Sequence, residues 1–175
     1  MRRAVTLVLG GARSGKSALA ERLLLQSAGA ATPCYIATAE AWDDEMRARI
    51  AQHRAARAGD GWVTREAPLD LAQAIADLPA EAPVLVDCLT LWLSNHLLNG
   101  SDLAAQSAML IDALCGHHGL VIAVANEVGL GIVPENALAR RFRDAAGRLN
   151  QDVAARADRV IFVAAGLPLA LKGQL

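Results

Sequence analysis

A glycine-rich segment near the start of the sequence has the residue types and spacing of a phosphate-binding loop. It reads GGARSGKS over residues 10–17 and fits the pattern G-x-x-x-x-G-K-[ST]. Glycines let backbone N–H groups approach phosphate oxygens closely, and the helix that follows adds the positive end of its dipole. The lysine of this pattern reaches the β- and γ-phosphates, and the serine hydroxyl binds Mg²⁺. The predicted nucleotide-contacting residues are Gly10, Gly11, Ala12, Arg13, Ser14, Gly15, Lys16 and Ser17. The alternative is a glycine-rich turn that binds nothing.

A second candidate for the same site is an acidic residue at the end of an apolar run. The segment VLVDCLT over residues 84–90 places Asp87 in this position. A carboxylate beside a phosphate loop binds Mg²⁺ through the waters of the ion, so we predict that Asp87 and Ser17 hold the metal. The alternative is an aspartate that caps a helix starting near Thr90. The chain has no [NT]-K-x-D element, which argues against a guanine-specific switch protein.

A charged segment further along contains a candidate catalytic histidine. Residues 43–58 are expected to be a helix, on which Glu45, Arg49 and His53 follow one another at spacings of four along one face. Arg54 and Arg57 follow His53 closely, and a histidine in such a place can act as a general acid or base. A surface helix could carry the same residues without any function, and the spacing alone does not separate the two interpretations.

The composition predicts one compact domain, which we place over residues 1–175. With 54% hydrophobic residues and a net charge of −1, the chain resembles a globular protein without the positive charge of a nucleic-acid binder. Three cysteines without C-x-x-C spacing argue against a disulfide framework or a zinc site, and favour the cytoplasm. No apolar run approaches the length of a membrane span.

The elements that must position these residues alternate between strand and helix. Apolar strands are expected at residues 4–10, 33–39, 62–66, 83–89, 119–126 and 159–166, with helices at 16–29, 43–58, 69–78, within 89–117 and at 137–157. Continuously apolar strands are typical of a parallel sheet covered on both faces. The prediction is an α/β fold, a three-layer P-loop NTPase domain of the RecA-like kind with a mainly parallel sheet. Residues 165–173 are expected to add a short C-terminal hairpin.

Several of these stretches together resemble a known enzyme family over essentially the whole chain. They are GGARSGKS, YIATAEAWDDEMRARIAQHRAAR, GWVTREAP, VLVDCLTLWLSN and the long segment that begins ANEVGLGIVPE. The family is the bifunctional adenosylcobinamide kinase/adenosylcobinamide-phosphate guanylyltransferase of cobalamin biosynthesis. The resemblance implies that an NTP, ATP or GTP, phosphorylates adenosylcobinamide. GMP then passes from GTP to the new phosphate, with release of pyrophosphate.

The resemblance also implies roles for individual residues. The family's R-I-x-x-H-[RK] stretch, here RIAQHR, makes His53 the residue that becomes guanylylated, with Lys16 as the second catalytic group. Further nucleotide contacts map onto Thr38, Ala39, Glu40, Arg54, Ala55, Ala56, Arg57, Glu66 and Asp87. Asn126 and Glu127 are the candidates for the corrinoid side. Family members associate as trimers, so a homotrimer is expected. Within this chemistry the open alternatives are a P-loop kinase of another small alcohol and a nucleotide-dependent binding module.

Overall fold

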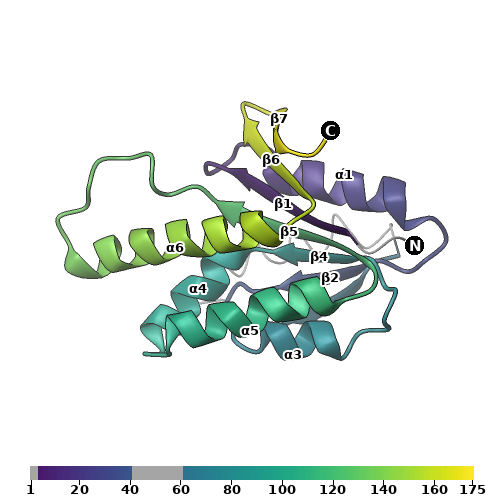
Figure 1. The fold of residues 1–175 in the computed structure, drawn as a ribbon, viewed down its shortest axis with the longest axis horizontal. Helices are drawn as coiled ribbons and strands as arrows, with labels where there is room; N and C mark the ends of the chain where they lie inside the picture. Colours follow the sequence, from purple (N-terminus) through teal and green to yellow (C-terminus); the bar gives the residue numbers. More distant parts are fainter. Residues whose placement is uncertain (1–3, 41–60) are drawn as a thin grey trace.

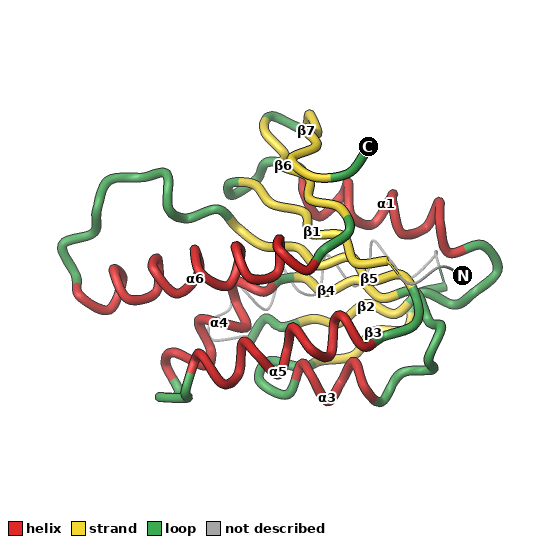
Figure 2. Tube along the Cα trace, in the orientation of Figure 1, coloured by secondary structure: helices red, strands yellow, loops and turns green. Residues whose placement is uncertain are grey.

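The computed structural model of the chain describes residues 4–40 and 61–175 (Figure 1). The helix expected at residues 43–58 lies outside these ranges. In the described part, a central sheet separates two layers of helices, as the yellow strands and red helices of Figure 2 show.

The sheet has seven strands in the order β3-β2-β4-β5-β1-β6-β7. The strands are β1 (Ala4–Gly10), β2 (Cys34–Ala37), β3 (Val63–Glu66), β4 (Val84–Asp87), β5 (Leu120–Asn126), β6 (Arg159–Ala164) and β7 (Leu167–Lys172). Every neighbouring pair is parallel except β6 and β7, which form an antiparallel hairpin at one edge. The predicted mainly parallel sheet and C-terminal hairpin are therefore confirmed.

The helices of the described part cover both faces of the sheet unequally. They are α1 (Lys16–Ala28), α3 (Leu71–Ala76), α4 (Leu89–Leu98), α5 (Leu103–Gly116) and α6 (Ala137–Arg156). Helix α1 lies on one face, and the other four lie on the opposite face (Figure 1). Two buried apolar clusters correspond to these faces: Leu19 and Leu24 of α1 pack with Val8, whereas residues of α5 and α6 pack with Val86 and Val121.

Local sequence explains where helices α5 and α6 begin and which side α6 buries. Asp102 and Asn136 precede α5 and α6, and each side chain accepts hydrogen bonds from two backbone N–H groups of the first turn. In α6 the buried residues Ala146, Leu149, Asn150 and Val153 recur at spacings of three and four, which is the apolar stripe of an amphipathic helix.

Candidate functional site

The predicted phosphate loop connects the central strand β1 to α1. Gly10 has no room for a side chain, because a Cβ atom there would lie 2.5 Å from the Val163 carbonyl oxygen. Gly15 has a φ of +91°, a conformation that glycine adopts readily. Lys16 is buried, and its Nζ atom donates a hydrogen bond to the Gly11 carbonyl oxygen at 3.1 Å. The ammonium group is thus held over the loop, where bound phosphates would lie.

The register of the sheet brings the other predicted residues to the same edge. Gly10 is paired with Asn126 of β5. Asp87 at the end of β4 is paired with Val124 of β5 and Ala37 of β2, and Ala37 with Glu66 of β3. One strand, β5, therefore lies between the phosphate loop and Asp87. The carboxyl ends of parallel strands are where ligands bind in open α/β sheets.

Asp87 is on the same face of the sheet as α1. Leu85, two residues earlier on the strand, packs in the cluster that α1 covers, and side chains two apart share a face. The Tyr35 hydroxyl from that cluster donates a hydrogen bond to Asp87 Oδ2 at 3.0 Å. Ser17, in the first turn of α1, is half-buried. Serine hydroxyl and carboxylate oxygens suit Mg²⁺, so the chemistry of these two residues fits the predicted ion.

A buried thiol reports on the electrostatics of this region. Burial raises the pKa of Cys88 from 9.0 to about 11, and the neighbouring Asp87 carboxylate contributes to the increase, while backbone N–H groups and Lys16 act in the opposite direction. The Asp87 carboxylate and the Lys16 ammonium therefore act on this thiol in opposite directions, and burial is the largest cause of the shift.

Thr38 has a role in the protein that sequence reasoning did not identify. Its side chain is fully buried, and its Oγ1 donates to the Cys88 carbonyl oxygen at 2.7 Å and accepts from the Cys88 N–H at 2.9 Å. The Thr38 N–H also donates to the Asp87 carbonyl oxygen at 3.3 Å. Thr38 therefore fixes the backbone on both sides of the Asp87–Cys88 peptide. Its direct contact with nucleotide stays a prediction.

Helix α4 holds the ends of β2 and β3 in place. Asn95 donates through Nδ2 to the carbonyl oxygens of Thr38, at 2.9 Å, and Pro68, at 3.0 Å. Trp92 Nε1 donates to the Leu69 carbonyl oxygen at 2.9 Å, and His96 Nε2 lies 3.1 Å from the same oxygen. These residues, at positions i, i+3 and i+4 of an apolar helix, form a polar stripe that could have been read from LWLSNH. They position the segments that carry Ala39 and Glu40, both half-buried, and the exposed Glu66.

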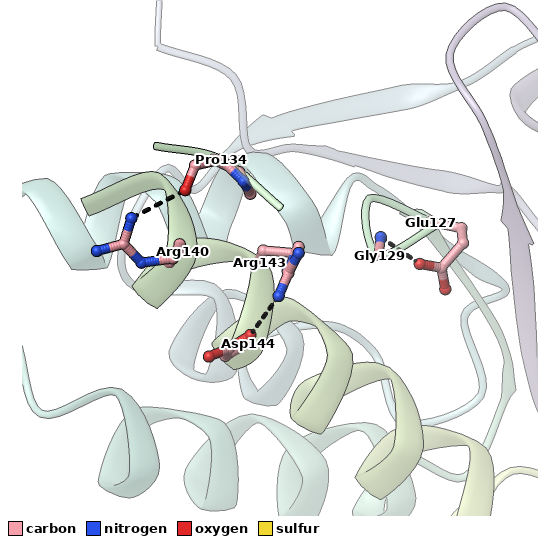
Figure 3. Close-up of polar contacts among 6 residues, drawn as sticks. All are labelled: Glu127, Gly129, Pro134, Arg140, Arg143 and Asp144. Atoms are coloured by element: carbon pink, nitrogen blue, oxygen red, sulfur yellow. Dashed lines mark hydrogen bonds and ion pairs between the residues drawn. The ribbon is translucent and has the colours of Figure 1, made fainter. Parts of the chain in front are cut away.

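The two predicted corrinoid residues begin the loop between β5 and α6. Asn126 is held at the sheet edge, since its N–H donates to Thr90 Oγ1 at 2.6 Å and its carbonyl oxygen accepts from Asn150 at 3.3 Å. Glu127 follows, with its N–H bonded to the Gly10 carbonyl oxygen at 3.1 Å. The Glu127 carboxylate accepts a hydrogen bond from the Gly129 N–H (Figure 3).

The rest of this loop extends beyond the sheet (Figure 2). Leu130 and Ile132 are 82% and 98% exposed, which is unusual for side chains of this size. The far end of the loop is tied to α6, because Arg140 donates to the carbonyl oxygen of Pro134 (Figure 3). Arg140 also donates to the carbonyl oxygen of Glu135. Arg143 and Asp144, an ion pair at 3.5 Å, lie next to it on the helix.

The predicted residues His53, Arg54, Ala55, Ala56 and Arg57 lie outside the described residues. The structure therefore brings together the loop, Asp87 and the ends of β2, β3 and β5, and leaves the roles of His53 and its neighbours as predictions. Among residues 4–40 and 61–175, no three His, Cys, Asp or Glu side chains are grouped as a metal site, and no helix is long and apolar enough to cross a membrane.

Comparison with protein families gives a match over nearly the whole chain. Residues 6–171 match the family described as cobinamide kinase / cobinamide phosphate guanyltransferase. The chain is 50% identical over 171 residues to the bifunctional adenosylcobalamin biosynthesis protein CobP of Pseudomonas aeruginosa, covering 96% of this chain and 97% of that protein. It is 43% identical to the bifunctional adenosylcobalamin biosynthesis protein CobU of Salmonella typhimurium, covering 95% and 98%.

Solved structures of more distant proteins share the fold. The flagellar accessory protein FlaH from Methanocaldococcus jannaschii superposes with a TM-score of 0.51 at 13% identity, over 98% of this chain and 79% of that one. The ATPase domain of a second protein superposes with a TM-score of 0.51 at 14% identity, over 92% of this chain and 69% of that one. At these identities the likeness concerns fold alone, and it agrees with the predicted P-loop class.

Proposed function

The chain belongs to the cobinamide kinase / cobinamide phosphate guanyltransferase family, and we propose that its two reactions share the phosphate loop and use His53 as the acceptor of GMP. The protein is a bifunctional enzyme of adenosylcobalamin biosynthesis, a cobinamide kinase and a cobinamide-phosphate guanylyltransferase. The arrangement of the site supports one way in which a single domain of residues 1–175 carries out both reactions.

In the kinase step, the acceptor hydroxyl of adenosylcobinamide attacks the γ-phosphorus of ATP or GTP. A P–O bond forms to the hydroxyl oxygen, and the bond to the β,γ-bridging oxygen breaks. The backbone N–H groups of residues 10–17 and the Lys16 ammonium stabilise the phosphate charge during this transfer. Ser17 and Asp87 would hold Mg²⁺, which, when bound, offsets further charge on the phosphates.

In the guanylyl step, an imidazole nitrogen of His53 attacks the α-phosphorus of GTP. A P–N bond forms and pyrophosphate leaves. A phosphate oxygen of adenosylcobinamide phosphate then attacks the same phosphorus and breaks the P–N bond, which gives adenosylcobinamide-GDP and free histidine. Arg54 and Arg57 are next to the nucleophile in sequence and supply positive charge for the phosphates.

The remaining predicted residues complete the two substrate sites. Thr38, Ala39, Glu40, Ala55, Ala56 and Glu66 contact the nucleotide, and Asn126 and Glu127 contact the corrinoid. Asn126 ends β5, the strand between the phosphate loop and Asp87, so it lies at the sheet edge where the two substrates would meet. We further propose that the enzyme works as a homotrimer in the cytoplasm, where its three free thiols, all buried, stay reduced.

The observation that supports a phosphate site shared by the two reactions is the position of Asp87; the role of His53 is supported by the family resemblance alone. It lies one strand away from the phosphate loop, on the face that α1 covers, in a chain whose sequence matches the family over residues 6–171. This arrangement favours a ligand-binding loop over a glycine-rich turn that binds nothing, because the carboxyl ends of parallel strands are where ligands bind in open α/β sheets.

The test is covalent labelling with GTP that carries ³²P in the α-phosphate. The wild-type protein should retain label after denaturation, and the label should be lost in acid and kept in alkali, as for a phosphoramidate. His53→Ala should lose both the label and guanylyl transfer while still phosphorylating adenosylcobinamide. His118→Ala, which changes an exposed histidine elsewhere, is the matched control and should label normally.

Three results would contradict the proposal. Label that persists in His53→Ala would place the nucleophile elsewhere. Phosphorylation of another small alcohol without any labelling would indicate a simple kinase, and nucleotide binding without either product would indicate a binding module.

A further inference from the structure

The turn between β6 and β7 lies against the phosphate loop, although the two are about 150 residues apart in the chain (Figure 1). The Gly166 N–H donates a hydrogen bond to the Ser14 carbonyl oxygen at 2.9 Å. A Cβ atom built on Gly15 would lie 3.3 Å from Gly166 Cα, so the two glycines are in close contact. Val163 of β6 also limits the space at Gly10, at the beginning of the loop.

This contact determines the orientation of one peptide group in the loop. In a planar trans peptide, the carbonyl oxygen and the following N–H point in opposite directions. Because the Ser14 oxygen is held by the hairpin, the Gly15 N–H must point away from the hairpin. The backbone N–H groups of such a loop are the ligands that surround phosphate oxygens. A freely rotating Ser14–Gly15 peptide could instead present its carbonyl oxygen, which repels phosphate.

The turn has the backbone conformation needed to supply this donor. Ala165 and Gly166 connect Ala164 to Leu167 and have φ angles of +51° and +78°, as in a two-residue hairpin turn of type I′. The ladder pairs Ala164 with Leu167, so the Gly166 N–H is not used between the two strands and is directed to Ser14.

We propose that Gly166 is a positioning residue for the phosphate loop, and that the C-terminal hairpin sets the nucleotide affinity of both reactions by fixing the Gly15 N–H. The proposal rests on the proposed function only in assuming that nucleotide occupies residues 10–17. It does not depend on His53 or on guanylyl transfer.

The experiment replaces Gly166 by valine and uses Gly100→Val as the matched control. Both glycines have positive φ, +78° and +71°, and a Cβ atom at either position would meet nothing within 4 Å. The two substitutions should therefore cost similar backbone strain, while only Gly166 contacts the phosphate loop. Valine and asparagine both keep the backbone N–H, but valine is strained at positive φ and asparagine tolerates it, so Gly166→Asn is the rescue variant. Dissociation constants for GTP and ATP are measured by calorimetry, with the free energy of unfolding measured in urea.

We expect Gly166→Val to weaken the binding of both nucleotides by about tenfold. Strain at position 166 should displace the turn and release the Ser14 carbonyl, so that the hydrogen bond from the Gly15 N–H to a charged phosphate oxygen is lost. Gly100→Val should bind within about twofold of wild type at a similar loss of stability, and Gly166→Asn should recover most of the affinity. If a valine variant does not fold, the alanine pair Gly166→Ala and Gly100→Ala gives the same comparison.

The proposal is overturned if Gly166→Val binds GTP as tightly as wild type, or if Gly100→Val loses affinity to the same extent. Failure of the function proposed above would appear differently, as tight nucleotide binding without covalent label or guanylyl product.

Discussion

Replacing Thr38 by valine should destabilise the protein even though the two side chains have nearly the same shape. Because valine has nearly the volume of threonine, the substitution leaves no cavity. Because Thr38 is fully buried, the substitution also adds no exposed apolar surface. What it removes is the hydroxyl, which bonds both the N–H and the carbonyl oxygen of Cys88.

The carbonyl oxygen and the N–H of Cys88 are left with different numbers of hydrogen-bond partners after the substitution. The carbonyl oxygen keeps a second hydrogen bond from the Trp92 N–H at 3.2 Å, so it remains partly satisfied. The N–H donates to the Thr38 hydroxyl at 2.9 Å, and Cys88 is 5% exposed, so water has little access to replace that acceptor. An unsatisfied buried donor costs about 1–3 kcal/mol, and the weakened carbonyl adds a smaller amount. We expect the free energy of unfolding to fall by about 2–3 kcal/mol.

The assay is equilibrium unfolding in urea, together with kcat for both reactions. Thr38→Ser keeps the hydroxyl and loses one methyl group, so it should cost about 1 kcal/mol and leave kcat nearly unchanged. Thr64→Val, on the exposed side of β3, should be close to neutral. The reasoning is refuted if Thr38→Val is as stable as wild type, or if Thr38→Ser is destabilised as much as Thr38→Val.

Three further predictions concern the same edge of the sheet. Lys16→Ala should lower kcat of both reactions by about 100-fold or more, and normal guanylyl transfer by the folded variant would contradict a shared phosphate site. Asp87→Asn should raise the Mg²⁺ concentration needed for turnover. It should change the free energy of unfolding by less than about 1 kcal/mol, because the amide oxygen can still accept a hydrogen bond from Tyr35. Unchanged Mg²⁺ dependence would mean that Asp87 has a structural role only. Burial raises the pKa of Cys88 from 9.0 to about 11, so the unfolded thiol loses its proton first and stability falls as pH rises through this range. Between about pH 8 and 11 the wild type should lose up to about 3 kcal/mol more stability than Cys88→Ala, and equal losses would contradict the cause given for the shift.

The sequence predicted the sheet well because each central strand is apolar on both faces. The runs AVTLVLG and LVIAVAN are buried almost throughout, and such runs have few alternatives to a covered parallel strand. The phosphate loop and Asp87 were predictable for a related reason, since each directly follows or ends an apolar run, and strand ends determine where the ligands of a parallel sheet lie.

The residues that position the site were not predictable in this way. The contacts of Asn95 with Thr38 and Pro68 join three segments that are far apart in sequence. The hydrogen bond from Gly166 to Ser14 depends on how two turns meet across the sheet edge, which no local pattern encodes. The segment that carries Glu45, Arg49 and His53 lies outside the described residues. The role of His53 rests on the family resemblance and is tested by the labelling experiment.

The strand order has a consequence for how the protein is made. Strand β1 carries the phosphate loop and leaves the ribosome before its partners in the sheet, β5 and β6, which end at Asn126 and Ala164. At ordinary translation rates of roughly 5–20 residues per second, about 6–30 s pass between them. During that interval the apolar segment AVTLVLG has neither neighbour, so the nascent chain depends on chaperones or on transient collapse to stay soluble. The nucleotide-binding motif is therefore encoded before the two strands that flank β1, and it becomes competent only after both have been made.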